Sequence, residues 1–146
     1  MANETMLKFG YPDMLIREYE HWVVLLRPAQ VTLGALVLAA KSDATAFGGL
    51  PPGAHGELAT ITKEIEATMF AEIGYERINY LMLMMVDPNV HFHVLPRYEG
   101  DRMLEDVTLG DAGWPGPPDL KSAPHLDQPE LEKLRARFSR SWLTSC

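Results

Sequence analysis

The chain lacks several features that mark particular classes of protein. Its 146 residues contain one cysteine, Cys146, so neither an intramolecular disulfide nor a zinc motif built on cysteines is expected. No apolar run approaches the ~20 residues of a transmembrane helix. The opening segment Met1–Thr5 lacks the basic and then apolar pattern of a secretory signal. We therefore expect a cytoplasmic protein with no membrane partner and, at this length, a single domain over residues 1–146.

Positive charge is also scarce. Thirteen Lys and Arg residues stand against 20 Asp and Glu residues, which gives a formal net charge of −7. A protein that coats nucleic acid needs clustered Lys and Arg to neutralise phosphates, so we expect no nucleic-acid partner. A small anionic ligand is compatible with this balance, because one pocket can be locally positive or lined with backbone N–H groups.

The most informative segment that is present is Asn89–Tyr98, with the sequence Asn-Val-His-Phe-His-Val-Leu-Pro-Arg-Tyr. Hydrophobic residues alternate with His91 and His93, and strict alternation is the period of a β-strand. One face of this strand can pack on a core, while the other presents two imidazoles with Asn89 just before them. Imidazole has the side-chain pKa nearest neutrality, so such a pair can supply a nucleophile, a proton donor or two metal ligands.

The rest of the chain predicts an α+β protein. Apolar runs indicate strands, and an apolar stripe at spacings of three and four indicates one central helix that ends at Gly74. The expected order is strands at Leu15–Glu18, Trp22–Leu26 and Leu33–Ala40, a loop at Ser42–Gly56, a helix from Glu57, a strand at Ile78–Val86, and the histidine strand. Because Asp87-Pro88 alone separates the last two strands, we expect a tight antiparallel pair within a meandering sheet of about five strands.

Beyond Tyr98 the composition changes. Gly110–Pro118 contains three Gly and three Pro around Trp114, too many for regular structure. Asp127–Glu130 then has the features of a helix start, namely an N-cap, an early proline and a Glu three residues after the cap. Apolar residues follow on one helical face at Leu131, Leu134, Phe138 and Trp142. We expect this C-terminal helix to pack on the body of the protein or on a partner chain.

With these elements in place, the chain resembles the histidine triad (HIT) superfamily of nucleotide hydrolases and transferases. The signature of that superfamily is His-φ-His-φ-His-φ-φ, where φ is hydrophobic, commonly followed by Pro-Arg on the last strand of the core sheet. Asn89, His91 and His93 take the three histidine positions. The resemblance covers roughly residues 9–98 and includes Val31–Leu38, which is similar to the family's Pro-Gly-His-hydrophobic strand. It implies one HIT-like domain, with the proline-rich loop and the C-terminal helix over residues 99–146.

The resemblance also implies a mechanism. The middle histidine attacks the α-phosphate of a nucleotide and carries a nucleotidyl intermediate, while the last contacts the phosphate or the bridging atom and helps the leaving group. By position these roles fall on His91 and His93. A neutral imidazole can attack through one nitrogen while a backbone carbonyl holds the other as N–H. The implied substrates are nucleoside phosphoramidates or dinucleoside polyphosphates, and no cofactor is implied.

Three departures from the signature bear on the substrate. Asn89 can keep an orienting hydrogen bond, but it cannot change its charge near neutral pH. Val86–Pro88 nearly deletes the Gly-Gln-rich loop that wraps the phosphates in the family, and the Asp87 carboxylate would repel phosphate. Arg27 stands where the family has an acidic or Asn residue that often touches the ribose. A guanidinium there can bind an additional phosphate or carboxylate.

Four residues are therefore candidate substrate contacts. Arg27 and Arg97 can hold one anionic group near the histidines, although an Arg at the end of a strand is more often only a solvated cap or part of an ion pair. Asn79 lies in the strand that precedes the histidines, and Trp114 can cover a base or the sheet of a partner subunit. With few donors left for a polyphosphate tail, we expect a shallow, open pocket over His91. Activity should then be weak on phosphoramidates and lower on diadenosine tetraphosphate.

Two alternatives stay open. His-x-His also begins metal sites, but Glu99, the nearest carboxylate after the motif, lies six residues past His93, which does not match the spacing of a cupin. The second alternative is a catalytically weak or inactive HIT domain that binds a nucleotide or a partner. The loss of the first histidine and of the phosphate loop favours this second alternative.

The last expectation concerns assembly. The helical stripe and one sheet face account for the core, yet large aromatic side chains remain to be buried at Trp22, Trp114, Phe138 and Trp142. The resemblance implies a homodimer, in which the two subunits pair about a two-fold axis with a self-complementary interface.

Overall fold

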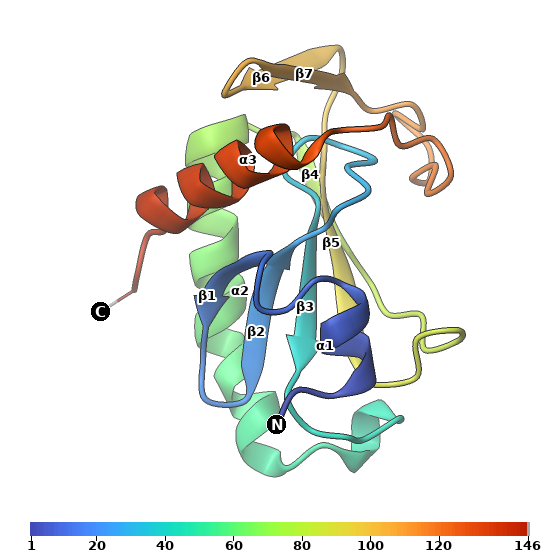
Figure 1. Ribbon diagram of the computed structural model, residues 1–146, viewed down its shortest axis with the longest axis vertical. Helices are drawn as coiled ribbons and strands as arrows, with labels where there is room; N and C mark the ends of the chain where they lie inside the picture. Colours follow the sequence, from blue (N-terminus) through green and yellow to red (C-terminus); the bar gives the residue numbers. More distant parts are fainter. Residues whose placement is uncertain (146) are drawn as a thin grey trace.

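The computed structural model describes residues 1–145, and Cys146 lies outside the described residues (Figure 1). The elements follow in the order α1 (Glu4–Lys8), β1 (Leu15–Glu18), β2 (Trp22–Leu26), β3 (Leu36–Ala40), η1 (Phe47–Gly49), α2 (Pro52–Ile73), β4 (Arg77–Leu81), β5 (His91–Arg97), β6 (Asp101–Leu104), β7 (Val107–Gly110) and α3 (Gln128–Ser141). None of the described helices is both long and apolar enough to cross a membrane.

The first five strands form one antiparallel sheet in the order β1-β2-β3-β5-β4. Because α2 carries the chain from β3 to the far edge, β4 lies beyond β5 and is not a neighbour of β3. In the register between β3 and β5, Val37 lies opposite His93 and Ala39 lies opposite His91. This arrangement confirms the predicted α+β class, with a five-stranded antiparallel sheet, a central helix and a C-terminal helix.

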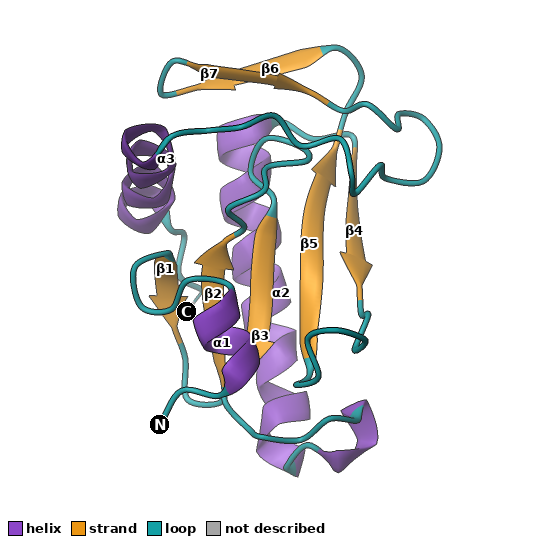
Figure 2. Ribbon diagram, turned by 45° about the vertical axis from the view of Figure 1, so that its right-hand side comes forward, coloured by secondary structure: helices purple, strands orange, loops and turns teal. Residues whose placement is uncertain are grey.

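The two faces of the sheet are covered by different helices. Figure 2 shows α2 behind the sheet and α1 in front of β2 and β3. On the α2 face, Trp22 donates a hydrogen bond from Nε1 to the carbonyl of Ala54 at 2.8 Å. Phe92 packs on the same face, with its ring 6.0 Å from that of Trp22. Since side chains alternate along a strand, His91 and His93 face α1.

The central helix begins earlier than the sequence indicates. We predicted a loop up to Gly56, but α2 starts at Pro52, where proline suits the first helical position. Gly53 lies against the ring of His21, and a Cβ there would come within 2.7 Å of Nε2. The expected end is confirmed, because Gly74 caps the helix in the left-handed conformation at φ 65°.

The strand before the histidines is shorter than predicted. β4 ends at Leu81, and residues 82–90 form an irregular loop instead of a tight turn. Met85 and Val86 are 82% and 86% exposed, so this apolar run is not a core strand. Its return toward β5 is fixed at Asp87, which forms an ion pair of 2.9 Å with Lys8 of α1. The expectation that the loop before the histidine strand is nearly deleted is therefore wrong.

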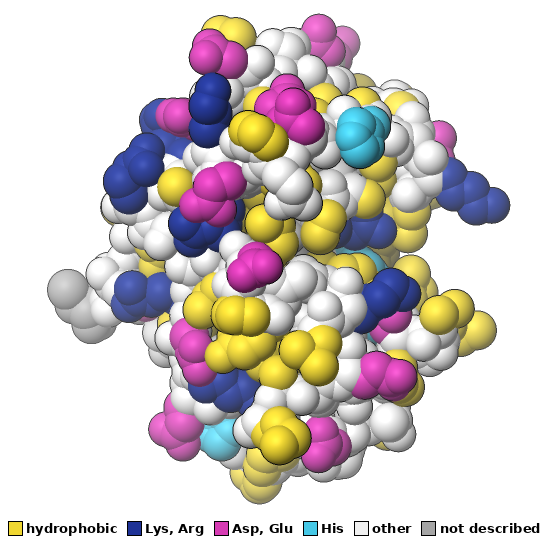
Figure 3. All heavy atoms as spheres, in the orientation of Figure 1, with side chains coloured by type: hydrophobic (Ala, Val, Ile, Leu, Met, Phe, Trp, Pro, Cys, Tyr) yellow, Lys and Arg dark blue, Asp and Glu magenta, His cyan; other side chains and the backbone are white. Residues whose placement is uncertain are grey.

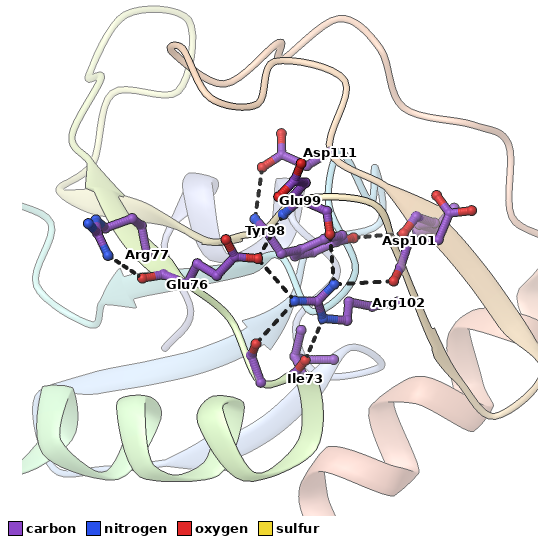
Figure 4. Close-up of polar contacts among 10 residues, drawn as sticks. Ile73, Glu76, Arg77, Tyr98, Glu99, Asp101, Arg102 and Asp111 are labelled. Carbon is purple, nitrogen blue, oxygen red and sulfur yellow. Dashed lines mark hydrogen bonds and ion pairs between the residues drawn. The ribbon is translucent and has the colours of Figure 1, made fainter.

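A β-hairpin that the sequence did not predict follows β5. β6 and β7 pair through a turn at Glu105 and Asp106, both with positive φ. Arg102 of β6 fixes the hairpin to the C-terminus of α2, where its Nε donates to the carbonyl of Ile73 at 3.0 Å (Figure 4). Its guanidinium carbon also lies 4.8 Å from the centre of the Tyr98 ring. The hairpin thus pairs with carbonyls that the helix end leaves free.

The C-terminal helix matches its prediction. Asp127 caps α3 and Glu130 completes the capping box. The helix packs on β1 and β2 through its buried apolar face at Leu131, Leu134 and Phe138. Trp22, Phe138 and Trp142 are all buried within the described chain, at 0%, 0% and 8% exposure. Their burial removes the main sequence argument for a partner subunit, and the homodimer stays a prediction.

Candidate functional site

The two histidines of β5 lie side by side beneath α1. Their ring centres are 5.0 Å apart and the rings are nearly perpendicular. His91 is completely buried and His93 is 6% exposed. Two imidazoles at this depth need hydrogen-bond partners, and the partners that they have determine which nitrogen of each ring carries a proton.

His91 has one paired nitrogen and one free nitrogen. Its Nδ1 lies 2.7 Å from the main-chain carbonyl oxygen of Asn89. A carbonyl only accepts hydrogen bonds, so Nδ1 carries the proton and Nε2 keeps its lone pair. Within residues 1–145, Nε2 is buried and has no hydrogen-bond partner. This geometry presents a neutral imidazole whose free nitrogen is available as a nucleophile.

His93 is paired with a cation. The Nε of Arg27 donates to His93 Nδ1 at 3.2 Å. Burial is the main cause that lowers the pKa of His93 to about 4; the charge of Arg27 and the neighbouring His91 act in the same direction, and Asp87 acts in the opposite direction. His93 is therefore neutral near pH 7, with its proton on Nε2. The structure thus brings Arg27 to the histidine pair, and its contact with a substrate stays a prediction.

Asn89 contributes to this site through its main chain. Its side chain points to the N-terminal segment, where Oδ1 accepts hydrogen bonds from the Thr5 amide and hydroxyl at 3.2 and 3.1 Å. The side-chain Nδ2 donates to the carbonyl of Asp43 at 3.0 Å. The position of the first triad histidine therefore anchors α1, while the carbonyl of the same residue orients His91.

The N-terminal segment covers both histidines. The ring of Phe9 lies 5.6 Å from each imidazole, measured between ring centres. Asn3 fixes the start of the segment by donating to the carbonyls of Ala40 and Ser42 at 2.8 and 2.9 Å. Four surface pockets formed by the described residues are lined by neither histidine. His91 itself is completely buried, so the expectation of an open pocket over it is wrong.

The surface above this cover is partly apolar. Figure 3 shows hydrophobic side chains gathered on the face that carries α1 and on the loop at the right-hand edge of the view. Leu7 of α1 is 58% exposed, and the loop contributes Met85 and Val86. The histidines are thus closed off by a short helix and one aromatic ring, next to a loop with exposed apolar side chains.

Arg97 and Asn79 lie at the other end of β5. Arg97 is buried and binds Asp111 through Nε at 2.6 Å and through Nη2 at 3.1 Å. Its Nη1 donates to Asn79 Oδ1 at 2.8 Å, and Nη2 also donates to the carbonyl of Gly116. Leu95 lies between His93 and Arg97 on the same face of the strand. All three guanidinium nitrogens of Arg97 are therefore paired within the protein, and contact of Arg97 or Asn79 with a substrate stays a prediction.

Trp114 belongs to the loop that this network holds. Its amide donates to the carbonyl of Asp111 at 3.1 Å, and its side chain is partly exposed. The loop is tied to the end of β5 that is remote from His91, so the structure does not bring Trp114 together with the histidine pair. A role for Trp114 in binding a base stays a prediction.

Three residues of these two networks were missed from the sequence. Thr5 and Phe9 lie in a segment with no recognisable motif, and no pattern connects them to a strand more than 80 residues away. Asp111 offered one signal, because an acidic residue soon after a Pro-Arg strand end is a natural ion-pair partner. Among residues 1–145, no three side chains of His, Cys, Asp or Glu converge on a position that could hold a metal ion.

Comparison with known proteins rests on structure. No protein-family model matches the chain, and no curated protein sequence matches it. A histidine triad protein of Sinorhizobium meliloti superposes with a TM-score of 0.74 at 22% identity, covering 97% of this chain and 96% of its own. A histidine triad protein of Bradyrhizobium japonicum gives a TM-score of 0.73 at 16% identity, with 98% of both chains covered. A hypothetical histidine triad nucleotide-binding protein of Sulfolobus tokodaii gives 0.69 at 17% identity, covering 94% of this chain and 88% of its own.

Proposed function

Because this chain has the histidine triad fold, we propose that it is a nucleotide hydrolase or transferase that acts on the α-phosphate of a nucleotide conjugate. The observation that carries the proposal is the state of His91. Its Nδ1–H is held by the Asn89 carbonyl, and its Nε2 is buried and unpaired among the described residues. Leaving a buried nitrogen without a hydrogen bond costs free energy, so such an atom needs an explanation, and a role in catalysis is one.

The reaction runs in two displacements. The lone pair of His91 Nε2 forms a bond to the α-phosphorus, and the bond to the leaving group breaks with its electron pair. The ring of the nucleotidyl-histidine then carries a positive charge, which the Asn89 carbonyl stabilises through Nδ1–H. Water attacks the same phosphorus in the second step, the P–N bond breaks, a proton is released, and His91 returns to its neutral form. With another acceptor in place of water, the same step is a transfer.

His93 assists through hydrogen bonding. Its Nδ1 is occupied by Arg27, so Nε2–H is the group that can face a substrate. Donation to a phosphoryl oxygen or to the bridging atom stabilises the negative charge that develops during displacement. This role needs no change in the protonation of His93.

Access to His91 requires the cover to move. Attack needs the phosphorus within ~3–3.5 Å of Nε2, but this nitrogen is buried, and the Phe9 ring centre lies 5.6 Å from that of His91. The side chain of Phe9 or the five-residue helix α1 must therefore be displaced when a nucleotide binds. Exposed side chains of α1 and of loop 82–90 then border the opened site.

The test is hydrolysis by matched histidine variants. Adenosine phosphoramidate and diadenosine tetraphosphate are offered to the wild type, to His91→Ala and to His125→Ala, which changes an exposed histidine away from the pair. We expect His91→Ala to abolish turnover of both substrates and His125→Ala to retain it. Undiminished turnover in His91→Ala would contradict the proposal.

A second candidate is a HIT-like domain that binds nucleotides without turnover. The closed cover over His91 and the use of the Asn89 side chain as an anchor for α1 favour this candidate. Calorimetric titration with a nucleoside monophosphate separates the two. Binding without any turnover by the wild type would support the second candidate and contradict the first.

A further inference from the structure

Arg27 is held rigidly beside His93. It directly follows β2, and its own amide donates to the carbonyl of Ala35 at 3.0 Å. Gln30 donates from Nε2 to the carbonyl of Arg27 at 2.7 Å. On the side chain, Nη1 donates to the carbonyl of Ala29 at 2.6 Å, which aims Nε at the imidazole. The loop after β2 thus fixes the guanidinium at both its main chain and its side chain.

This contact selects the tautomer of His93 and, together with burial, keeps the ring neutral. A guanidinium donates hydrogen bonds and accepts none, so Nδ1 of His93 must offer a lone pair. A second proton on the ring would place an N–H against the Arg27 N–H and bring two cations together. The other charged or titratable groups facing His93 are His91 on β5 and Asp87 in loop 82–90. Asp87 is already paired with Lys8 of α1, so it does not offset the guanidinium fully.

We propose that Arg27 is a positioning residue that holds His93 as the neutral tautomer protonated at Nε2, and that it thereby restricts the site to leaving groups that depart as anions. This inference rests on the proposed function and names its substrate class. The class consists of nucleoside phosphoanhydrides, in which the α-phosphate is bonded to another phosphate.

The restriction follows from the chemistry of the two bonds. When a P–O–P bond breaks, the departing phosphate keeps the electron pair as a stable anion, and His93 Nε2–H only has to donate a hydrogen bond to it. When a P–N bond breaks, the departing nitrogen must receive a proton, because an amine does not leave as its anion. General acid catalysis of this kind typically contributes ~10²–10⁴-fold, and it needs a group that is protonated at the working pH.

The geometry therefore reverses one expectation from the sequence. A missing phosphate loop predicted that phosphoramidates would be preferred over diadenosine tetraphosphate. Loop 82–90 is present, and the Arg27–His93 hydrogen bond keeps His93 neutral, a form too weakly acidic to give its Nε2 proton to a departing amine. We now expect the anhydride to be the better substrate.

The first arm of the test does not depend on activity. Nitrogen-15 NMR of the histidine rings reports the tautomer and the pKa of His93 in the wild type, in Arg27→Met and in Arg27→Lys. We expect the wild type to hold the proton on Nε2 and to stay neutral down to pH 5. In Arg27→Met, His93 should become a mixture of tautomers and titrate closer to the ordinary value of ~6.5. Arg77→Met is the control, because the side chain of this exposed arginine bonds only the Glu76 carbonyl among residues 1–145, and it should leave the His93 spectrum unchanged.

The outcomes of this arm are separate from those of the proposed function. A wild-type His93 that is protonated at Nδ1, or that titrates near 6.5, would overturn the inference even in an active enzyme. An unchanged His93 spectrum in Arg27→Met would overturn it as well, whereas Arg27→Lys keeps a cationic donor and should lie between the wild type and Arg27→Met. Since the wild-type spectrum alone can overturn the inference, the inference stays falsifiable if a variant does not fold.

The second arm compares leaving groups by kcat/KM for diadenosine tetraphosphate and adenosine phosphoramidate between pH 5 and 8. We expect the wild type to favour the anhydride, with a preference that varies little with pH. In Arg27→Met the preference should shift toward the phosphoramidate at the acidic end of this range, because His93 is then protonated more readily than in the wild type, although it remains buried. A wild type that favours the phosphoramidate would overturn the inference, whereas no turnover of either substrate would contradict the proposed function and leave the NMR result to decide the role of Arg27.

Discussion

The two ends of β5 carry polar side chains on one face of the sheet, but they differ in how these side chains are paired. At the hairpin end, every guanidinium nitrogen of Arg97 has a partner within the protein. At the α1 end, His91 keeps Nε2 unpaired among the described residues. The comparison teaches that burial of a polar group alone does not indicate function. The presence or absence of hydrogen-bond partners distinguishes the hairpin end, which stabilises the fold, from the α1 end, which can take part in a reaction.

The largest expected effect is a loss of stability when Arg97, at the hairpin end of β5, is replaced. Arg97→Met leaves Asp111, whose side chain is 1% exposed, without its cation. Losing one partner of a buried ion pair costs about 3–5 kcal/mol. Urea unfolding should therefore show a loss of this size for Arg97→Met, whereas the control Arg77→Met should stay within about 0.5 kcal/mol of the wild type. Equal stability of the two variants would contradict a structural role for Arg97.

The next prediction concerns the α1 end of β5, where His93 should make the stability of the protein depend on pH. Burial, assisted by the positive charge of Arg27, lowers the pKa of His93 to about 4. The unfolded chain, with a histidine pKa of ~6.5, therefore binds more protons than the folded protein between these two values. Stability is fully present above pH ~6.5 and falls as the pH drops toward 4, by on the order of 1–3 kcal/mol. Urea unfolding between pH 4 and 7 measures this slope, and His93→Gln should reduce it. An unchanged slope in His93→Gln would show that other groups cause it.

A smaller effect tests the anchor of α1. Asn89→His restores the first histidine of the signature, but the imidazole nitrogens cannot reproduce the amide bonds to Thr5 and Asp43. Leaving these buried groups without their partner costs about 1–3 kcal/mol. We expect lower stability by urea unfolding and no gain in kcat. A clear rise in kcat would show that the side chain at position 89 takes part in turnover.

The smallest effect concerns the cover. Phe9→Ala removes the ring over both histidines while leaving the hydrogen bonds of Asn3 and Thr5 in place. We expect faster modification of His91 by diethylpyrocarbonate, followed by mass spectrometry of the histidine peptide. Leu7→Ala serves as the matched control, because Leu7 is exposed on the same helix. Equal modification rates in the wild type and Phe9→Ala would mean that another segment limits access.

The sequence predicted the elements that depend on local geometry and missed those that do not. Periodic patterns fixed by local geometry were read correctly, namely the stripe of α2 with its Gly74 cap, the capping box of α3 and the alternation of β5. The hairpin turn was missed because Glu105 and Asp106 adopt positive φ without glycine. The apolar residues after Leu81 look like a strand, although Met85 and Val86 face solvent.

The site itself was only half predictable. His91, His93 and Arg27 were selected from one motif and one aligned position, and the structure brings them together. Their protonation states depend on contacts across long stretches of chain, because Arg27 and His93 are 66 positions apart and Thr5 and Asn89 are 84 positions apart. No local pattern encodes such pairs. The sequence did not reveal that Arg97 belongs to a different network from the histidines, because all three residues lie on the same face of the same strand.

The central claim is that the unpaired nitrogen of His91 is a nucleophile, and the most direct measurement is the mass of the protein during turnover. The wild type is mixed with diadenosine tetraphosphate, quenched within the first turnover and analysed by intact and peptide mass spectrometry under conditions that preserve phosphohistidine. We predict one added adenylate, located on the peptide that contains His91 and absent in His91→Ala. Turnover with no adduct on His91, or with an adduct on another residue, would contradict the account.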